Sequence, residues 1–247
     1  MKTKYQVIEK TDFPIGQKYE GKVRDVYDVG NGKLVIVTTD RISAFDRILG
    51  TIPHKGQVLN EFSAFWFEQT RDIVPNHLIK VIDPNISVVK KTKRIPLEVV
   101  IRGYLAGSTD TSIWRRYENG ERNFAGLILP NNLRKGEKLQ RPLVEFYTKA
   151  EVGEHDELIN QAGLEHDTMR LQEISLNLFN YAATFLENKG LTFIDTKYEF
   201  GLDENGNIIL IDEINTPDSS RIGMELEKGE FFHLDKEYFR LKFSKRK

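Results

Sequence analysis

The sequence predicts an α+β protein with antiparallel strands toward both ends of the chain. Two hairpin signals, Gly30-Asn31-Gly32 and Asn205-Gly206, each stand between segments with strand-like patterns. The clearest helical patterns lie between these two regions, without the regular strand–helix alternation that a parallel sheet requires. These observations favour segregated strands and helices over a doubly wound fold.

The elements can be placed in chain order from periodicity and turn chemistry. We expect strands at Val23–Val29 and Leu34–Thr39, on either side of the first hairpin signal. Apolar side chains at helical spacing predict a helix over Gln57–Gln69. A second apolar stripe, from Leu171 to Phe185, predicts another helix, with Thr168 near its start and Gly190 just past its end. The remaining expectations are a short helix carrying Trp114 capped by Thr109-Asp110-Thr111, and strands at Ile86–Lys90, Leu97–Ile101, Leu191–Gly201 and Ile208–Ile214.

A stretch rich in proline and lysine, Asp83–Pro96, suggests a hinge between two lobes. We therefore expect an antiparallel N-terminal lobe over residues 1–90 and a larger α+β lobe over residues 91–247.

Composition excludes several classes of function. Lys and Arg total 36 against 37 Asp and Glu, so the net charge of −1 gives no basic field for nucleic acid. The chain has no cysteine, which excludes a disulfide scaffold, a thiolate metal site and a cysteine nucleophile. No signal peptide or membrane-spanning stretch is evident, so we expect a cytoplasmic protein.

The segment FIDTKYEFG (193–201) alternates charged and apolar side chains. In a strand, Asp195, Lys197 and Glu199 would share one face. A two-residue loop at Asn205-Gly206 would place Glu199 opposite Asp212, and two facing carboxylates require a cation or a shared proton. Mg²⁺ suits such a pair, and Lys197 suits a phosphate or carboxylate. The alternative is an exposed hairpin with a solvated charged face, and a longer turn would shift the register.

Other cations stand in segments rich in glycine or turn residues. YEGKVRDVY offers Lys22 and Arg24 after a glycine, and RGYLAGS offers Arg102 and Ser108 around two glycines. Each pattern suits a phosphate, which backbone amides and arginine bind well, but each is also compatible with an ordinary solvated segment. The same two interpretations apply to Lys149, His155 and Asp156 in YTKAEVGEHDE and to Ser220 and Arg221 in TPDSSR.

Taken together, these stretches resemble the SAICAR synthetase family. The resemblance runs from about residue 19 to residue 221, and IPLEVVIRGYLAGS and FIDTKYEFG are similar to the two signature stretches of the family. It implies a two-lobed α+β fold with an ATP cleft between the lobes. It also implies a Mg²⁺-dependent ligase that joins CAIR, a 5′-phosphoribosyl aminoimidazole carboxylate, to L-aspartate and releases SAICAR, ADP and phosphate.

The resemblance also implies roles for individual residues. Those on the ATP side are Lys22, Arg24, Lys149 and Glu199, and those at the metal are Glu199 and Asp212. Those that bind substrate are Arg102, Ser108, Ser220 and Arg221 for the ribosyl phosphate, with His155 and Asp156 near aspartate, and Lys197 with Asp195 lies near the reacting carboxylate.

Two departures from the family pattern bear on these roles. The chain has EFYTK (145–149) where many relatives have TPSTK, and IGME after Arg221 where a tryptophan is common.

The alternative functions are a small-molecule kinase of similar fold, which would not require aspartate, and a nucleotide-binding regulatory protein without activity, which would not release ADP. The sequence leaves the oligomeric state open.

Overall fold

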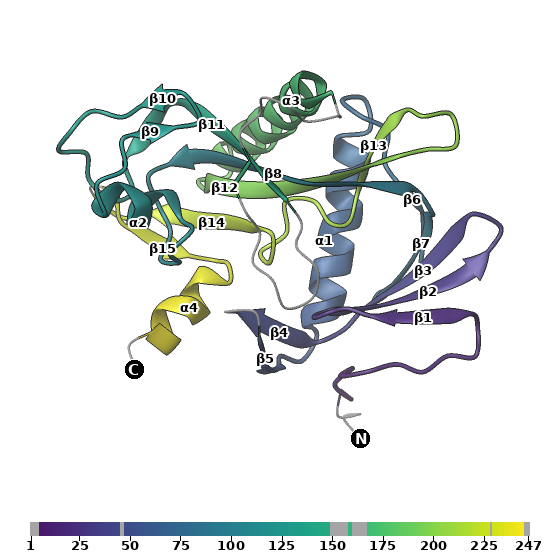
Figure 1. Cartoon of the computed structure of the whole chain (residues 1–247). Helices are drawn as coiled ribbons and strands as arrows, with labels where there is room; N and C mark the ends of the chain where they lie inside the picture. Colours follow the sequence, from purple (N-terminus) through teal and green to yellow (C-terminus); the bar gives the residue numbers. More distant parts are fainter. Residues whose placement is uncertain (1–4, 45–46, 149–157, 160–166, 228, 245–247) are drawn as a thin grey trace. The chain divides into compact units, whose positions relative to one another are not determined.

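The computed structural model describes residues 5–44, 47–148, 158–159, 167–227 and 229–244 (Figure 1). The chain forms two compact units, one of Met1–Arg94 with Gly201–Ile211 and one of Ile95–Phe200 with Asp212–Lys247. Both contain antiparallel strand pairs, and the helices are few and separate from them in sequence, so the predicted α+β class is confirmed.

A five-stranded antiparallel sheet dominates the first unit. Its strand order is β1-β2-β3-β7-β6. The turn at Asn31-Gly32 has positive φ values of 51° and 66°, a conformation that asparagine and glycine adopt readily, and it joins the two strands expected there. The bounds are β1 (Gln17–Glu20), β2 (Arg24–Gly30), β3 (Lys33–Thr38), β6 (Leu78–Asp83) and β7 (Ile86–Lys90).

The predicted first helix is present as α1 (Lys55–Gln69), beginning two residues before the expected Gln57. The helix buries Leu59, Trp66 and Phe67. The apolar residues that predicted it are only partly on this face, because Val58, Phe62 and Phe65 are exposed. A small hairpin of β4 (Arg41–Ala44) and β5 (Arg47–Thr51) precedes it in the chain.

The boundaries of the first unit differ from the sequence-based division at residue 90. The unit continues to Arg94 and includes Gly201–Ile211, where β13 (Ile208–Ile211) lies. Leu210 anchors this segment, because its amide donates to Pro75 O at 2.9 Å and its carbonyl accepts from His77 N at 3.0 Å. The proposed hinge Asp83–Pro96 is largely strand, since it contains β7 and the start of β8.

In the second unit, the strands follow the order β11-β8-β12-β14-β15. The long helix α3 (Thr168–Glu187) covers the stripe expected from the sequence. Its Phe179 ring packs closely on Gly103 of β8, since a Cβ at that position would lie only 2.9 Å from the ring. The chain ends in α4 (Glu237–Ser244). The strand bounds are β8 (Lys93–Tyr104), β11 (Lys138–Thr148), β12 (Thr192–Leu202), β14 (Ser220–Glu225) and β15 (Phe231–His233).

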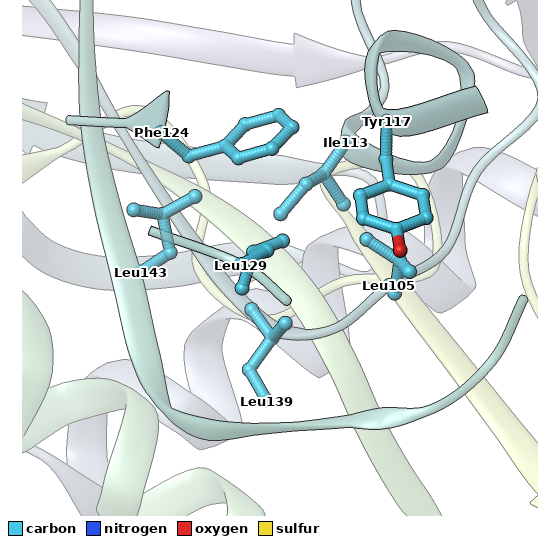
Figure 2. Close-up of a cluster of buried hydrophobic side chains, with 7 residues drawn as sticks. All are labelled: Leu105, Ile113, Tyr117, Phe124, Leu129, Leu139 and Leu143. Atoms are coloured by element: carbon cyan, nitrogen blue, oxygen red, sulfur yellow. The ribbon is translucent and has the colours of Figure 1, made fainter. Parts of the chain in front are cut away.

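A cluster of buried apolar side chains holds the short helix α2 (Ile113–Glu118) in the second unit (Figure 2). Ile113 and Tyr117 lie four residues apart and contribute to it from one face of the helix. The cap differs from the expected Thr109-Asp110-Thr111, because Ser112 is the N-cap residue and its hydroxyl donates to Thr109 O at 2.6 Å. The other members are Leu105, Phe124, Leu129, Leu139 and Leu143, near β9 (Asn123–Phe124) and β10 (Leu127–Ile128).

In the described part of the chain, no helix is long and apolar enough to cross a membrane.

Candidate active site

Two arginines that are far apart in the sequence converge on one carboxylate in the second unit. Arg221, on β14, donates from Nη1 to Asp195 Oδ2 at 2.7 Å, and Arg102 Nη1, from β8, lies 4.0 Å from the same oxygen. All three residues are buried. The expected grouping of Arg102 with Arg221 is therefore present, and Asp195 lies between them.

The loop after β8 lies against the Arg221 guanidinium. Gly107 has a φ of +101°, and a Cβ there would lie 2.9 Å from Arg221 Nη2 and 2.4 Å from the Ser112 Cβ. Only glycine fits this combination of backbone angle and close approach. Ser108, the next residue, hydrogen-bonds through its side chain to Glu237 of α4. The structure thus places the Gly107-Ser108 backbone beside Arg221.

The side chain of Ser220 contacts a neighbouring strand rather than the arginines. Its hydroxyl lies 2.8 Å from that of Thr196, across the β12–β14 pair, and the side chain is buried. Ser220 therefore joins the turn before Arg221 to β12.

Carboxylates that the sequence analysis did not select hold both arginines. Glu145 Oε2, on β11, accepts from Arg102 Nε at 2.7 Å, and Glu237 Oε2 accepts from Arg221 Nε at 3.1 Å. Burial raises the pKa of Glu237, but Arg221, Ser108 and Arg240 outweigh burial and lower it to about 2. A glutamate inside an otherwise apolar strand, as in LVEFY, was the available signal for Glu145, because such a charge requires a partner.

Lys197 forms a second group of charges on β12. Its ammonium donates to Glu98 Oε1 at 2.7 Å and to Glu199 Oε1 at 3.2 Å. Burial lowers the pKa of Lys197, but the negative charges of Glu199, Glu98 and Asp212 outweigh it and raise that pKa. Lys197 therefore stays protonated at neutral pH, in contact with the carboxylates of Glu98 and Glu199.

Asp195 and Lys197, expected as a pair, have different partners. Asp195 contacts the two arginines, whereas Lys197 contacts Glu98 and Glu199. Alternation along β12 puts their side chains on one face but about 6.6–7 Å apart along the strand. Each therefore belongs to its own group of charges.

The two-residue loop from which Glu199 was paired with Asp212 is not formed. Asp203 N donates to Asn207 O at 3.0 Å, so the loop contains three residues, Glu204–Gly206. The Asp203 side chain stabilises this longer loop, because Oδ1 accepts from Asn205 N at 2.9 Å and Asn207 N at 2.8 Å. The count that placed Glu199 directly opposite Asp212 is thus wrong by one residue.

The negative charge of Asp212 nevertheless contributes to the raised pKa of Lys197. Its backbone has a φ of 65°, which ends β13 at Ile211 rather than at the expected Ile214.

The remaining expected residues lie elsewhere or outside the described part. Lys22 and Arg24 belong to the first unit, in the loop after β1 and at the start of β2. There Arg41 donates from Nε to Lys22 O at 3.0 Å and from Nη2 to Gly21 O at 2.9 Å. Lys149, His155 and Asp156 lie outside the described residues.

Within the described ranges, no group of three or more His, Cys, Asp or Glu side chains could hold a metal ion by itself. A site with two carboxylates remains compatible with this result, because Mg²⁺ often takes one or two carboxylates and completes its shell with phosphate and water.

Comparison with known proteins gives a consistent result. The family model for SAICAR synthetase matches residues 17–247. A phosphoribosylaminoimidazole-succinocarboxamide synthase of Legionella pneumophila (strain Lens) is 45% identical over 250 residues, covering 96% of this chain and 79% of its own.

Two solved structures have the same fold. The SAICAR-synthase of Saccharomyces cerevisiae complexed with SAICAR has a TM-score of 0.82 and 33% identity, over 97% of this chain and 88% of its own. A SAICAR synthetase (Type-2) in complex with ADP has a TM-score of 0.76 and 29% identity, over 92% of this chain and 91% of its own. With a family match over most of its length, this chain belongs to the SAICAR synthetase family.

Proposed function

We propose that the two groups of charges in the second unit divide the work of SAICAR synthesis. As a member of its family, the chain is an ATP-dependent ligase of purine biosynthesis that joins CAIR and L-aspartate to give SAICAR, ADP and phosphate. In our proposal, the arginine group binds the ribosyl phosphate of CAIR, and the Lys197 group handles the reacting carboxylate and the metal.

One observation carries the first assignment, namely that Arg102 and Arg221 converge beside the Gly107-Ser108 backbone. Arginine binds phosphate through directed N–H groups, and backbone amides next to a glycine can approach an anion closely. The Ser108 hydroxyl, which donates to Glu237 in this structure, could donate to the phosphate only by exchanging that acceptor, and Ser220 would keep the turn before Arg221 in place.

The chemistry explains the need for a protonated lysine. A carboxylate is a poor acyl donor, so ATP must first convert one of its oxygens into a leaving group. This step brings a carboxylate anion close to a polyphosphate, and fixed cations lower the cost of that approach. Because its pKa is raised, Lys197 carries the positive charge needed to neutralise the CAIR carboxylate. For the same reason, Lys197 is a poor candidate for the base that takes a proton from aspartate.

The support for Mg²⁺ is the oxygen ligands gathered near Lys197. Glu98, Glu199 and Asp212 all raise the pKa of this one ammonium, and carboxylate oxygens are ligands that Mg²⁺ prefers. We assign Glu199 and Asp212 as the residues that would hold Mg²⁺. When bound, the ion would neutralise negative charge on the phosphates of ATP.

Lys22 and Arg24 are assigned to the ATP phosphates. The support is the shape of their loop, in which three successive carbonyls, those of residues 21–23, accept hydrogen bonds from Arg41 or Thr39. Gly21 allows this turn, because a Cβ there would lie 3.0 Å from Arg24 O.

Some expectations from the sequence stay predictions. They are the nucleotide-side role of Lys149, the place of His155 and Asp156 near aspartate, and the cytoplasmic location, and the oligomeric state stays open.

An omission assay tests the proposed function. ADP and SAICAR are measured with ATP, CAIR and L-aspartate together, and again with each left out. SAICAR should form only with all three. ADP release that needs CAIR but not aspartate, with no SAICAR in the complete mixture, would instead indicate a small-molecule kinase.

Isotope labelling tests the route. With ¹⁸O in both oxygens of the CAIR carboxylate, attack on the γ-phosphorus of ATP gives an acyl phosphate, and the aspartate amine then displaces phosphate. One labelled oxygen should leave in inorganic phosphate, and the other should remain in the amide carbonyl of SAICAR. Unlabelled phosphate would contradict this route even if SAICAR is made.

A further inference from the structure

We propose that Glu145 and Arg116 are positioning residues, which fix the guanidinium of Arg102 so that its Nη1 faces the substrate phosphate. The inference rests on the proposed role of Arg102 in binding that phosphate. It concerns residues of β11 and α2 to which the sequence analysis assigned no role.

The contacts of Arg102 define which nitrogen remains available. Nε donates to Glu145 Oε2 at 2.7 Å, while Nη2 donates to Tyr147 Oη at 3.2 Å and Thr111 O at 3.2 Å. Nη1 lies on the side of Asp195, at 4.0 Å from Oδ2, and among the described residues it has no acceptor at hydrogen-bonding distance. Glu145 and Tyr147 thus hold two of the three nitrogens and leave the third on the side of Asp195.

Glu145 is itself fixed from its other oxygen. Oε1 accepts from Arg116 Nη1 at 2.5 Å, so each carboxylate oxygen has its own arginine. The Glu145 side chain is fully buried and that of Arg102 is 6% exposed. Burial raises the pKa of Glu145, but the charges of Arg102 and Arg116 outweigh burial and lower it, so Glu145 stays ionised at neutral pH.

Arg116 is fixed in turn by its own surroundings. Nε and Nη2 donate to the two oxygens of Glu121 at 2.8 and 2.6 Å, and the guanidinium carbon lies 4.9 Å from the centre of the Phe124 ring. The helix that carries Arg116 is anchored by Ile113 and Tyr117 in the apolar cluster of Figure 2. The cluster therefore determines the position of Arg116, which determines that of Glu145 and then of Arg102.

This arrangement has a consequence for binding. A long arginine side chain loses rotamer freedom when it binds a ligand, and fixing it beforehand reduces that cost. Loss of Glu145 or Arg116 should therefore weaken CAIR binding selectively, although neither residue would touch the substrate. A network with only a structural role would instead affect stability, or all three substrates alike.

The test measures kcat and the KM values for CAIR, ATP and aspartate in matched variants. Glu145→Gln and Arg116→Met should each raise the CAIR KM by about 10-fold, the effect of losing one well-formed charged contact. The KM values for ATP and aspartate should stay within about 2-fold. Arg115→Met is the control, because Arg115 neighbours Arg116 on α2 but pairs with Glu118 at 41% and 43% exposure.

Tyr147→Phe supplies a milder variant if Glu145→Gln does not fold. It removes one hydroxyl, which bonds Arg102 Nη2 and Glu145 Oε2, and it should raise the CAIR KM by a few-fold. Glu145→Asp retains the charge and should recover part of the affinity lost in Glu145→Gln.

The outcomes separate this inference from the proposed function. If Arg102→Met raises the CAIR KM but Glu145→Gln, Arg116→Met and Tyr147→Phe all match Arg115→Met, the positioning role is wrong and the phosphate site stands. Equal changes in all three KM values would also overturn the positioning role. If Arg102→Met leaves the CAIR KM unchanged, the proposed phosphate site is wrong and this inference fails with it.

Discussion

Asp195 Oδ2 accepts a hydrogen bond of 2.7 Å from Arg221 Nη1 and lies 4.0 Å from Nη1 of Arg102. One carboxylate oxygen therefore faces both arginines that we assign to the substrate phosphate. Its negative charge reduces their mutual repulsion and keeps them close together while no substrate is bound. We therefore propose that Asp195 supports the phosphate site, and its expected place near the reacting carboxylate stays a prediction.

Asp195→Asn should weaken CAIR binding and destabilise the fold. Removing one partner of a buried ion pair costs about 3–5 kcal/mol, and we expect the lower end because asparagine keeps the shape. The free energy of unfolding is measured in urea, with Glu173→Gln as the control, since Glu173 pairs with Arg170 on an exposed face of α3. A loss no larger than that of the control would contradict the bridging role.

The loop that carries Lys22 should depend on Arg41. This buried arginine donates to the carbonyls of Gly21 and Lys22 and pairs with Asp25 Oδ1 at 2.9 Å. Arg41→Lys keeps the charge beside Asp25 but cannot bond several acceptors in a fixed plane. We expect the ATP KM to rise by about 5- to 10-fold, with the CAIR KM unchanged.

Arg47→Met, on the exposed β5 of the same small hairpin, is the control for Arg41. An ATP KM in Arg41→Lys that equals the control would mean that the loop does not act on the nucleotide.

Glu237 predicts a loss of stability in acid. Its pKa falls from the ordinary 4.5 to about 2, so its stabilising effect is complete above pH 4.5 and is lost as the pH falls toward 2. The shift corresponds to a contribution on the order of 3 kcal/mol. Unfolding measured from pH 5 to pH 2 should show this decline, and Glu237→Gln should make the curve flatter. Parallel curves for the two proteins would contradict the assignment to Glu237.

Local sequence patterns predicted the elements of the fold well. The helix α3 and the β2–β3 hairpin lie where the apolar stripe and the glycine-rich signal predicted them. The helix α1 is also present, although Val58, Phe62 and Phe65 of its predicted stripe are exposed. The second hairpin signal was also correct in place, but its loop is one residue longer because the Asp203 side chain accepts from one amide within the loop, that of Asn205, and from the amide of Asn207 just after it. Turn residues identify a hairpin, whereas side-chain bonds of this kind determine its length and therefore its register.

The candidate site was predictable only in part for a related reason. Alternation in FIDTKYEFG places the charges of β12 on one face, but it does not identify their partners. Glu145 and Glu237 act through arginines far from them in the sequence, Arg102 and Arg221. Such pairs depend on how strands and the terminal helix pack, which periodicity within one segment does not report.

The metal assignment is tested at Asp212. Its φ of 65° is tolerated by asparagine far better than by alanine, so Asp212→Asn removes the charge with little added strain. Three carboxylates act on Lys197, and losing one leaves two, so we expect the free energy of unfolding without metal to change by less than about 1 kcal/mol. Activity should be abolished, because Glu199 alone would have to hold the ion.

The measurement is nucleotide binding by calorimetry with and without Mg²⁺. In Asp212→Asn, this binding should lose most of its dependence on Mg²⁺. Asp203→Asn, in the exposed loop, is the control and should keep both activity and that dependence. A normal rate for Asp212→Asn at ordinary Mg²⁺ would show that this carboxylate does not hold the metal.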